Sequence, residues 1–180
     1  MMTIEQIENT KHIFRQALFA YHLTNAALKH RNMLFKADND PLSKFFAEHC
    51  NEFSAHMAVI NTLYNFLAIP KEIIFDELNK NPLTQKILSD INNQLKKVSE
   101  IISIEKAGLD SDLFKRLRNS LAHGRFILKN GGFTFTDQAI DGKNKITFFV
   151  KAEDFAPIIN DIEFKIMIPF VQDELQLSQE

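Results

Sequence analysis

The sequence predicts a mainly α-helical bundle of four to five helices, with a small antiparallel β-meander at about residues 125–150, before the C-terminal helix. Apolar residues recur at helical spacing over most of the chain. Between Arg125 and Val150 the period changes to two residues, and Asn130-Gly131-Gly132 and Asp141-Gly142 supply turns. We therefore expect more than half of the chain in helices, and strands only within residues 125–150.

The composition is typical of one globular domain spanning residues 1–180. Hydrophobic residues make up 45% of the chain and charged residues 24%, with only five glycines and five prolines. A chain of 180 residues is long enough to bury a sizeable core. The sequence contains no internal repeat and no low-complexity linker, so we expect no second domain.

Capping residues and breakers divide the helical part of the chain. Thr3 and Gln6 form a capping box that opens the first helix. The second helix ends before Pro70, and the third long helix is stopped by Gly108. The predicted helices cover about residues 3–35, 42–67, 71–83 and 84–106, followed by a motif helix at about 111–124 and a last helix that begins at Glu153 or Asp154, with a kink at Pro169.

The cysteine count and the hydropathy of the sequence indicate the cellular compartment in which the protein is expected. Cys50 is the single cysteine, so an intramolecular disulfide is excluded and an oxidising compartment is not indicated. The N-terminus has no basic region followed by an apolar one, and no apolar run approaches the roughly 18 residues of a membrane span. These observations predict a cytoplasmic protein that does not enter a membrane.

The stretch Ser111–Arg125, which reads S-D-L-F-K-R-L-R-N-S-L-A-H-G-R, concentrates polar chemistry on one helix. Ser111 or Asp110 is expected to cap its N-terminus, and Gly124 to take the left-handed position after its end. At about 100° per residue, one arc is apolar and the opposite arc is polar. The apolar arc consists of Leu113, Phe114, Leu117 and Leu121, and the polar one of Lys115, Arg118, Asn119, Ala122 and His123.

The polar arc lies in a locally positive part of the chain. Residues 106–129 contain six Lys/Arg against Asp110 and Asp112, a local net charge of +4, whereas the whole chain has a formal net charge of −2. Such a field attracts a phosphate backbone. We therefore expect Lys115, Asn119 and Arg125 to bind phosphate groups. The face around the small Ala122 suits either a ligand or a second copy of the chain.

The segment Arg118-Asn-Ser-Leu-Ala-His123 resembles the R-x4–6-H motif of the HEPN (higher eukaryotes and prokaryotes nucleotide-binding) superfamily. HEPN proteins are small helical bundles, and many are metal-independent RNases that bring two motifs together across a dimer interface. The resemblance implies that Arg118 and His123 are catalytic, that Asn119 fills the polar position after the arginine, and that no cofactor is needed. It also implies RNA as substrate, a homodimer formed through the motif helix, and a toxin–antitoxin or phage-defence setting with a cognate antitoxin.

The residue types suit RNA cleavage, because RNA supplies its own nucleophile, the 2′-hydroxyl. An imidazole such as that of His123 transfers protons near neutral pH, and the Arg118 guanidinium can stabilise charge on the phosphoryl oxygens. In a regular helix, however, the two side chains are about 140° apart. Either Gly124 lets the last turn unwind, or the two residues come from two chains of a composite site, which the resemblance favours.

Other groups of residues give weaker evidence for a functional site. His49, Glu52 and His56 share one helix face and could hold a metal ion, but both histidines lie beside an apolar stripe, which favours a structural role. Cys50 and Ser120 lack the geometry of activated nucleophiles. Two alternatives to an RNase stay open: a non-catalytic HEPN-like module that binds nucleotide, RNA or a protein, and a helical regulatory or antitoxin-like protein without a nucleic-acid role.

Overall fold

The computed structural model describes residues 4–34, 55–68, 78, 80–140 and 142–172. Helices account for more than half of the chain and are accompanied by a small antiparallel sheet, which confirms the predicted mainly α-helical fold. Several predictions lie outside the described residues: the capping role of Thr3, the start of the second helix, Cys50, and most of the short helix at 71–83.

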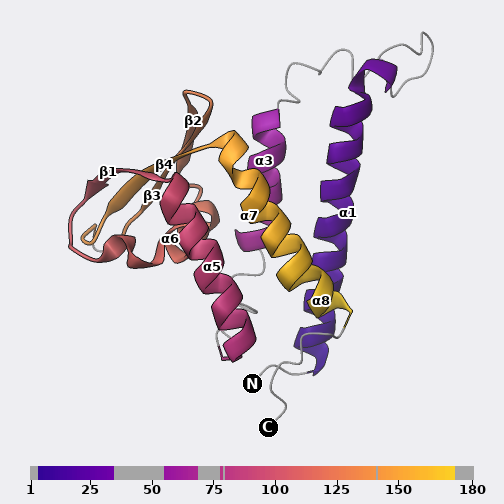
Figure 1. Cartoon of the computed structure of the whole chain (residues 1–180), viewed down its shortest axis with the longest axis horizontal. Helices are drawn as coiled ribbons and strands as arrows, with labels where there is room; N and C mark the ends of the chain where they lie inside the picture. The colour runs from indigo at the N-terminus through magenta and orange to yellow at the C-terminus, as the bar shows by residue number, and fades with distance from the viewer. Residues whose placement is uncertain (1–3, 35–54, 69–77, 79, 141, 173–180) are drawn as a thin grey trace.

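Long helices form one part of the molecule and run alongside one another (Figure 1). Their apolar faces are joined by aromatic contacts: the rings of Phe14 and Phe170 meet edge to face with centroids 5.6 Å apart, and those of Tyr21 and Phe66 meet at 5.5 Å. The helical segments are α1 (Ile4–Leu34), α3 (Ala55–Leu63), the π-helical turn η1 (Tyr64–Ala68), α5 (Pro82–Val98), α7 (Phe155–Ile162), the π-helical turn η4 (Glu163–Met167) and α8 (Ile168–Val171).

The sheet contains four strands among the described residues, in the order β1-β4-β3-β2, all antiparallel. The strands are β1 (Glu100–Ile104), β2 (Phe126–Lys129), β3 (Gly132–Asp137) and β4 (Ile146–Lys151). The predicted hairpin is confirmed: Asn130 and Gly131 join β2 to β3 with positive φ values of 53° and 73°.

The prediction that strands occur only within residues 125–150 is wrong, because β1 precedes the motif helix. The third long helix ends at Val98 rather than near residue 106, and Ser99 is extended. Its hydroxyl donates to the carbonyl of Leu95 over 2.6 Å. The isoleucines after it are β-branched and favour a strand, and β1 pairs with β4. Pairing across more than 40 residues therefore overrides the helical spacing of Ile102.

One face of the sheet packs against the rest of the molecule through phenylalanines. Phe133 and Phe135 of β3 and Phe148 of β4 are fully buried. The Phe135 ring stacks on Phe148 at 5.5 Å and meets Phe155 of α7 edge to face at 5.9 Å. Helix α6 (Leu113–Ala122), which carries the polar motif, lies against β3. The sheet therefore supports the motif helix.

Candidate functional site

Side chains on neighbouring elements fix the start of helix α6. Asp112 is the N-cap and accepts a hydrogen bond from the backbone N–H of Lys115 over 3.0 Å, so the predicted cap at Ser111 or Asp110 is displaced by one or two residues. Asn92 of α5 accepts from the N–H of Phe114 over 3.0 Å and donates to the carbonyl of Ser111 over 2.9 Å. Helix α5 thus holds the first turn of the motif helix in place through these two hydrogen bonds.

The end of helix α6 follows the predicted left-handed stop. Gly124 has a φ of +62°, and its N–H donates to the carbonyl of Leu121 over 3.0 Å. The N–H of Arg125 donates to the carbonyl of Ser120 over 2.8 Å, which completes a Schellman motif. His123 is the C-cap residue, and its side chain is exposed to solvent. An exposed imidazole at a helix end is free to meet a ligand or a second chain.

The sequence places Arg118 on the polar arc of the motif helix, away from the core. This prediction is wrong, because Arg118 is buried. The residue is 7% exposed, and its guanidinium carbon lies 5.6 Å from the ring centroid of Phe114, one turn earlier. Both side chains line a cavity of about 270 Å³ between α5 and α6, together with the polar side chains of Gln85, Ser89, Asn92, Ser111 and Asp112. The leucine arc of α6 revealed the core side of the helix, but it could not reveal that α5 covers the adjacent side.

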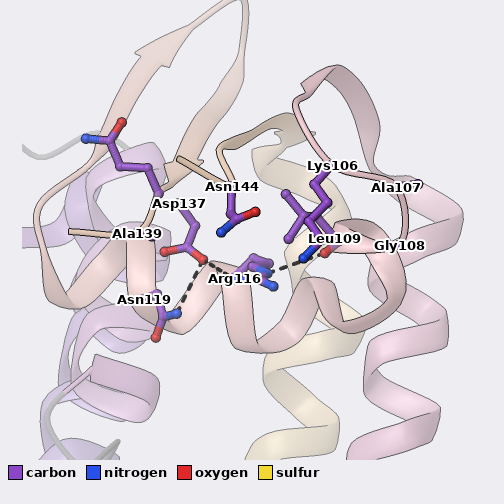
Figure 2. Close-up of a pocket in the computed structure, with 10 residues that line it drawn as sticks. Lys106, Ala107, Gly108, Leu109, Arg116, Asn119, Asp137, Ala139 and Asn144 are labelled. Atoms are coloured by element: carbon purple, nitrogen blue, oxygen red, sulfur yellow. Dashed lines mark hydrogen bonds and ion pairs between the residues drawn. The ribbon is translucent and has the colours of Figure 1, made fainter. Parts of the chain in front are cut away.

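Asn119 faces the opposite side of helix α6, toward the sheet. Its side-chain amide donates to Asp137 Oδ2 over 3.3 Å, and Arg116 Nη1 donates to the same oxygen over 2.9 Å (Figure 2). The Arg116 Nε group also approaches the carbonyl of Leu109 at 3.4 Å. Asn119 therefore contacts a carboxylate of the sheet.

The sequence reasoning missed the roles of Arg116 and Asp137. Asp137 ends strand β3, where alternation places it on the inner face with Phe133 and Phe135, and its side chain is only 6% exposed. An acidic residue in phase with buried phenylalanines was the signal that could have revealed it, since a buried carboxylate requires partners. The basic residue that meets it is Arg116, one of the six Lys/Arg residues of the positive segment 106–129.

The remaining predicted site residues lie outside the cavity that contains Arg118. Lys115 is exposed, and Arg125 is half-buried, with its Nη1 donating to the carbonyl of Gln138 over 3.0 Å. His123 does not line that cavity, nor does it line a second cavity of about 440 Å³ on the sheet side of α6, to whose wall Asn119 belongs. Within one chain, helix α6 therefore presents Arg118 and His123 to different surroundings. Its last turn does not unwind to bring them into one cavity.

Only one residue of the possible metal-binding group His49, Glu52 and His56 lies within the described part of the chain. His49 and Glu52 lie outside the described residues, and His56 is half-buried with its ring centroid 6.5 Å from that of Phe133. In the part of the chain that the structure describes, no three His, Cys, Asp or Glu side chains are grouped so that they could hold a metal ion. None of the described helices is both long and apolar enough to cross a membrane.

Sequence comparison identifies the family of this bundle and its polar helix. A family model described as HEPN pEK499 p136 matches residues 2–168, and the chain therefore belongs to this HEPN family. The match spans both the helices and the strands, so the β-meander lies within the family's own domain. Comparison with curated proteins and with solved structures found no significant match.

Proposed function

We propose that this chain is a metal-independent endoribonuclease of the HEPN type, and that its active site is completed by a second copy of the chain. One observation supports this proposal above the others. Arg118 lines the groove between α5 and α6, whereas His123 lies exposed at the end of α6. A single phosphate can meet both groups when Arg118 comes from one protomer and His123 from its partner.

The proposed reaction uses the substrate's own nucleophile. The 2′-oxygen forms a bond to the adjacent phosphorus as the bond to the 5′-oxygen breaks, and the 2′-hydroxyl proton passes to water. His123, as the imidazolium, donates a proton to the departing 5′-oxygen, and Arg118 stabilises the charge that accumulates on the phosphoryl oxygens. The products are a 2′,3′-cyclic phosphate and a 5′-hydroxyl.

Residues around the motif support binding of an RNA backbone. Lys115 is exposed on α6, and the half-buried Arg125 follows the helix end. Together with the local excess of positive charge, they are proposed to contact phosphates beside the cleaved one. An enzyme of this kind acts on cellular RNA in the cytoplasm and needs restraint, which fits a toxin–antitoxin or phage-defence system with a cognate antitoxin.

The proposal is tested by incubating purified protein with varied RNAs in the presence of EDTA, beside the His123→Ala variant. We expect cleavage by the wild type and a loss of about 10²–10⁴-fold in the variant, because proton transfer to the leaving group is removed. His12→Ala, which changes an exposed histidine on α1, is the matched control and should cleave normally. Equal cleavage by wild type and His123→Ala would contradict the assignment.

A second function is favoured by the burial of Arg118. At 7% exposure, this side chain offers little surface to a large polyanion, as expected for a HEPN module that binds nucleotide, RNA or a protein without cleaving it. The same assay separates the two functions. Absence of cleavage across varied RNAs, together with measurable RNA affinity, would favour the binding module.

A further inference from the structure

A second polar cavity lies on the sheet side of the motif helix. It has a volume of about 440 Å³, within the range of roughly 300–1,000 Å³ that is typical of small-molecule sites. It opens where α6, the end of β3 and the loop before α6 meet (Figure 2). Its polar side chains are those of Lys106, Arg116, Asn119, Asp137, Gln138 and Asn144.

The guanidinium of Arg116 is held in a fixed plane at one wall of this cavity. Its Nη1 group lies 2.9 Å from Asp137 Oδ2, and its Nε group lies 3.4 Å from the carbonyl of Leu109. The Arg116 side chain is 24% exposed, so one part of it remains accessible. Hydrogen bonds from N–H groups lie in the plane of the guanidinium, so neither of these bonds occupies its flat face. Nucleobases stack on arginine planes of this kind.

The charge balance of the cavity favours a base over a bare phosphate. The carboxylate of Asp137 compensates Arg116, which leaves Lys106 as the cation beyond that pair among the lining residues. The side chains of Asn119 and Asn144 gather around the pair and offer both donors and acceptors (Figure 2). A planar ligand with mixed hydrogen-bonding groups and one attached phosphate matches this set, and a nucleotide has that chemistry.

The cavity is connected directly to the proposed catalytic helix. Asn119 lines it, and the backbone carbonyl of Asn119 accepts from the N–H of His123 over 3.1 Å. The two positions are four residues apart along the helix, or about 6 Å along its axis. The same helix therefore carries one wall of the cavity and the proposed general acid.

From these observations we propose that the cavity is a nucleotide-reading subsite, which receives one unpaired base of the RNA and stacks it on Arg116. Asn119 and Asn144 contact the edge of the base, and Lys106 contacts its phosphate. This inference rests on the proposed ribonuclease function and adds to it a source of sequence preference. Such reading requires an unpaired base, so the substrate class is single-stranded RNA.

Binding of the four nucleoside 3′-monophosphates, followed by NMR on the full chain, tests the subsite without requiring cleavage. We expect saturable shifts at the Asn119 and Asn144 amides for at least one nucleotide. Asn144→Gly should weaken that binding about tenfold, because base contacts are lost while glycine accepts the positive φ of 55° at this position. Arg116→Lys should weaken it comparably, since the planar face is lost but the charge beside Asp137 is kept.

Asn130→Gly is the matched control, because Asn130 also has a positive φ, of 53°, but lies in the β2–β3 turn outside the cavity. It should bind nucleotides as the wild type does. Inorganic phosphate should not reproduce the shifts at the two amides. Equal binding by Asn144→Gly, or equal shifts with phosphate, would overturn the assignment of a base-reading subsite.

Cleavage assays on RNAs that differ at one base separate this inference from the proposed function. If Asn144→Gly cuts RNA with a changed base preference, both are supported. If RNA is cleaved but no nucleotide binds and the base preference is unchanged, the subsite is rejected while the ribonuclease stands. If nucleotides bind as expected and no RNA is cut, the cavity is a nucleotide site of a non-catalytic module, and the ribonuclease proposal fails.

Discussion

Arg116 Nη1 lies 2.9 Å from Asp137 Oδ2, and this ion pair joins the motif helix to the end of strand β3. Asn119 donates to the same oxygen over 3.3 Å, so two residues of α6 are oriented by one carboxylate. The Asp137 side chain is almost fully buried, whereas that of Arg116 is about three-quarters buried. This arrangement fixes the rotation of α6 against the sheet, and with it the directions in which the motif side chains point.

The first prediction concerns this pair. Asp137→Ala should lower the free energy of unfolding by about 2–3 kcal/mol, because it leaves the partly buried Arg116 guanidinium and Asn119 amide without their carboxylate. Urea denaturation followed by circular dichroism measures the change. Asp90→Ala, on the exposed face of α5, is the control and should stay within about 0.5 kcal/mol. A similar loss in both variants would show that the pair contributes nothing specific.

Local signals made much of the fold predictable from the sequence. The glycine that ends α6 has the predicted left-handed φ, and Asn130-Gly131 forms the predicted turn. The last helix begins at Phe155 after a 3-10 turn, within two residues of the position expected from Glu153 or Asp154. Each of these features depends on the conformational preference of one or two residues, which a sequence displays directly.

Features that depend on distant partners could not be predicted in the same way. Strand β1 exists because β4 pairs with it, and Arg118 is buried because α5 packs beside it. The Arg116–Asp137 pair joins residues 21 positions apart. Helical periodicity identifies the apolar face of a single helix. It does not indicate which neighbouring element covers the other faces of that helix. The identity of the motif residues was therefore visible in the sequence, whereas their environments were not.

The second prediction concerns Gly132, the first residue of β3. A Cβ atom built there would lie 2.7 Å from both the Cα of Lys151 and the ring of Phe149. Gly132→Ala should therefore lower the free energy of unfolding by about 1–3 kcal/mol, because the β3–β4 pair must move apart. Thermal denaturation measures this loss. Gly131→Asn is a suitable control, since nothing lies within 4 Å of its Cβ position and asparagine tolerates its φ of +73°.

A third prediction concerns assembly, which we propose to occur through the exposed side of α6. Ala122 lies on that side, and its small side chain allows close approach of a symmetry-related helix. Ala122→Glu should convert a dimer of twice 20.8 kDa into a 20.8 kDa monomer and abolish RNA cleavage, with an unchanged circular dichroism spectrum. Light scattering at micromolar concentration measures the mass. Ala20→Glu, on the exposed face of α1, should leave the dimer intact; a dimer that persists in Ala122→Glu would exclude this interface.

The last prediction tests whether Arg118 and His123 act from two chains. Arg118→Gln and His123→Ala homodimers should each be nearly inactive, although glutamine keeps part of the buried stem of Arg118 and so preserves packing. A heterodimer of the two variants, purified by two different tags, contains one site with Arg118 from one protomer and His123 from its partner. Its other site lacks both groups. We therefore expect about half of the wild-type activity per dimer.

The decisive comparison places both changes on one chain and pairs that chain with the wild type. In a composite site, each site of this heterodimer lacks one group, so cleavage should fall to the level of the inactive homodimers. If Arg118 and His123 instead acted within one chain, the wild-type protomer would retain a complete site. The heterodimer of the wild type with the doubly substituted chain would then keep about half of the activity. The heterodimer of the two single variants would keep none. The two arrangements thus give opposite results in the same two samples, under one cleavage assay, without any assumption about the RNA sequence that is cut.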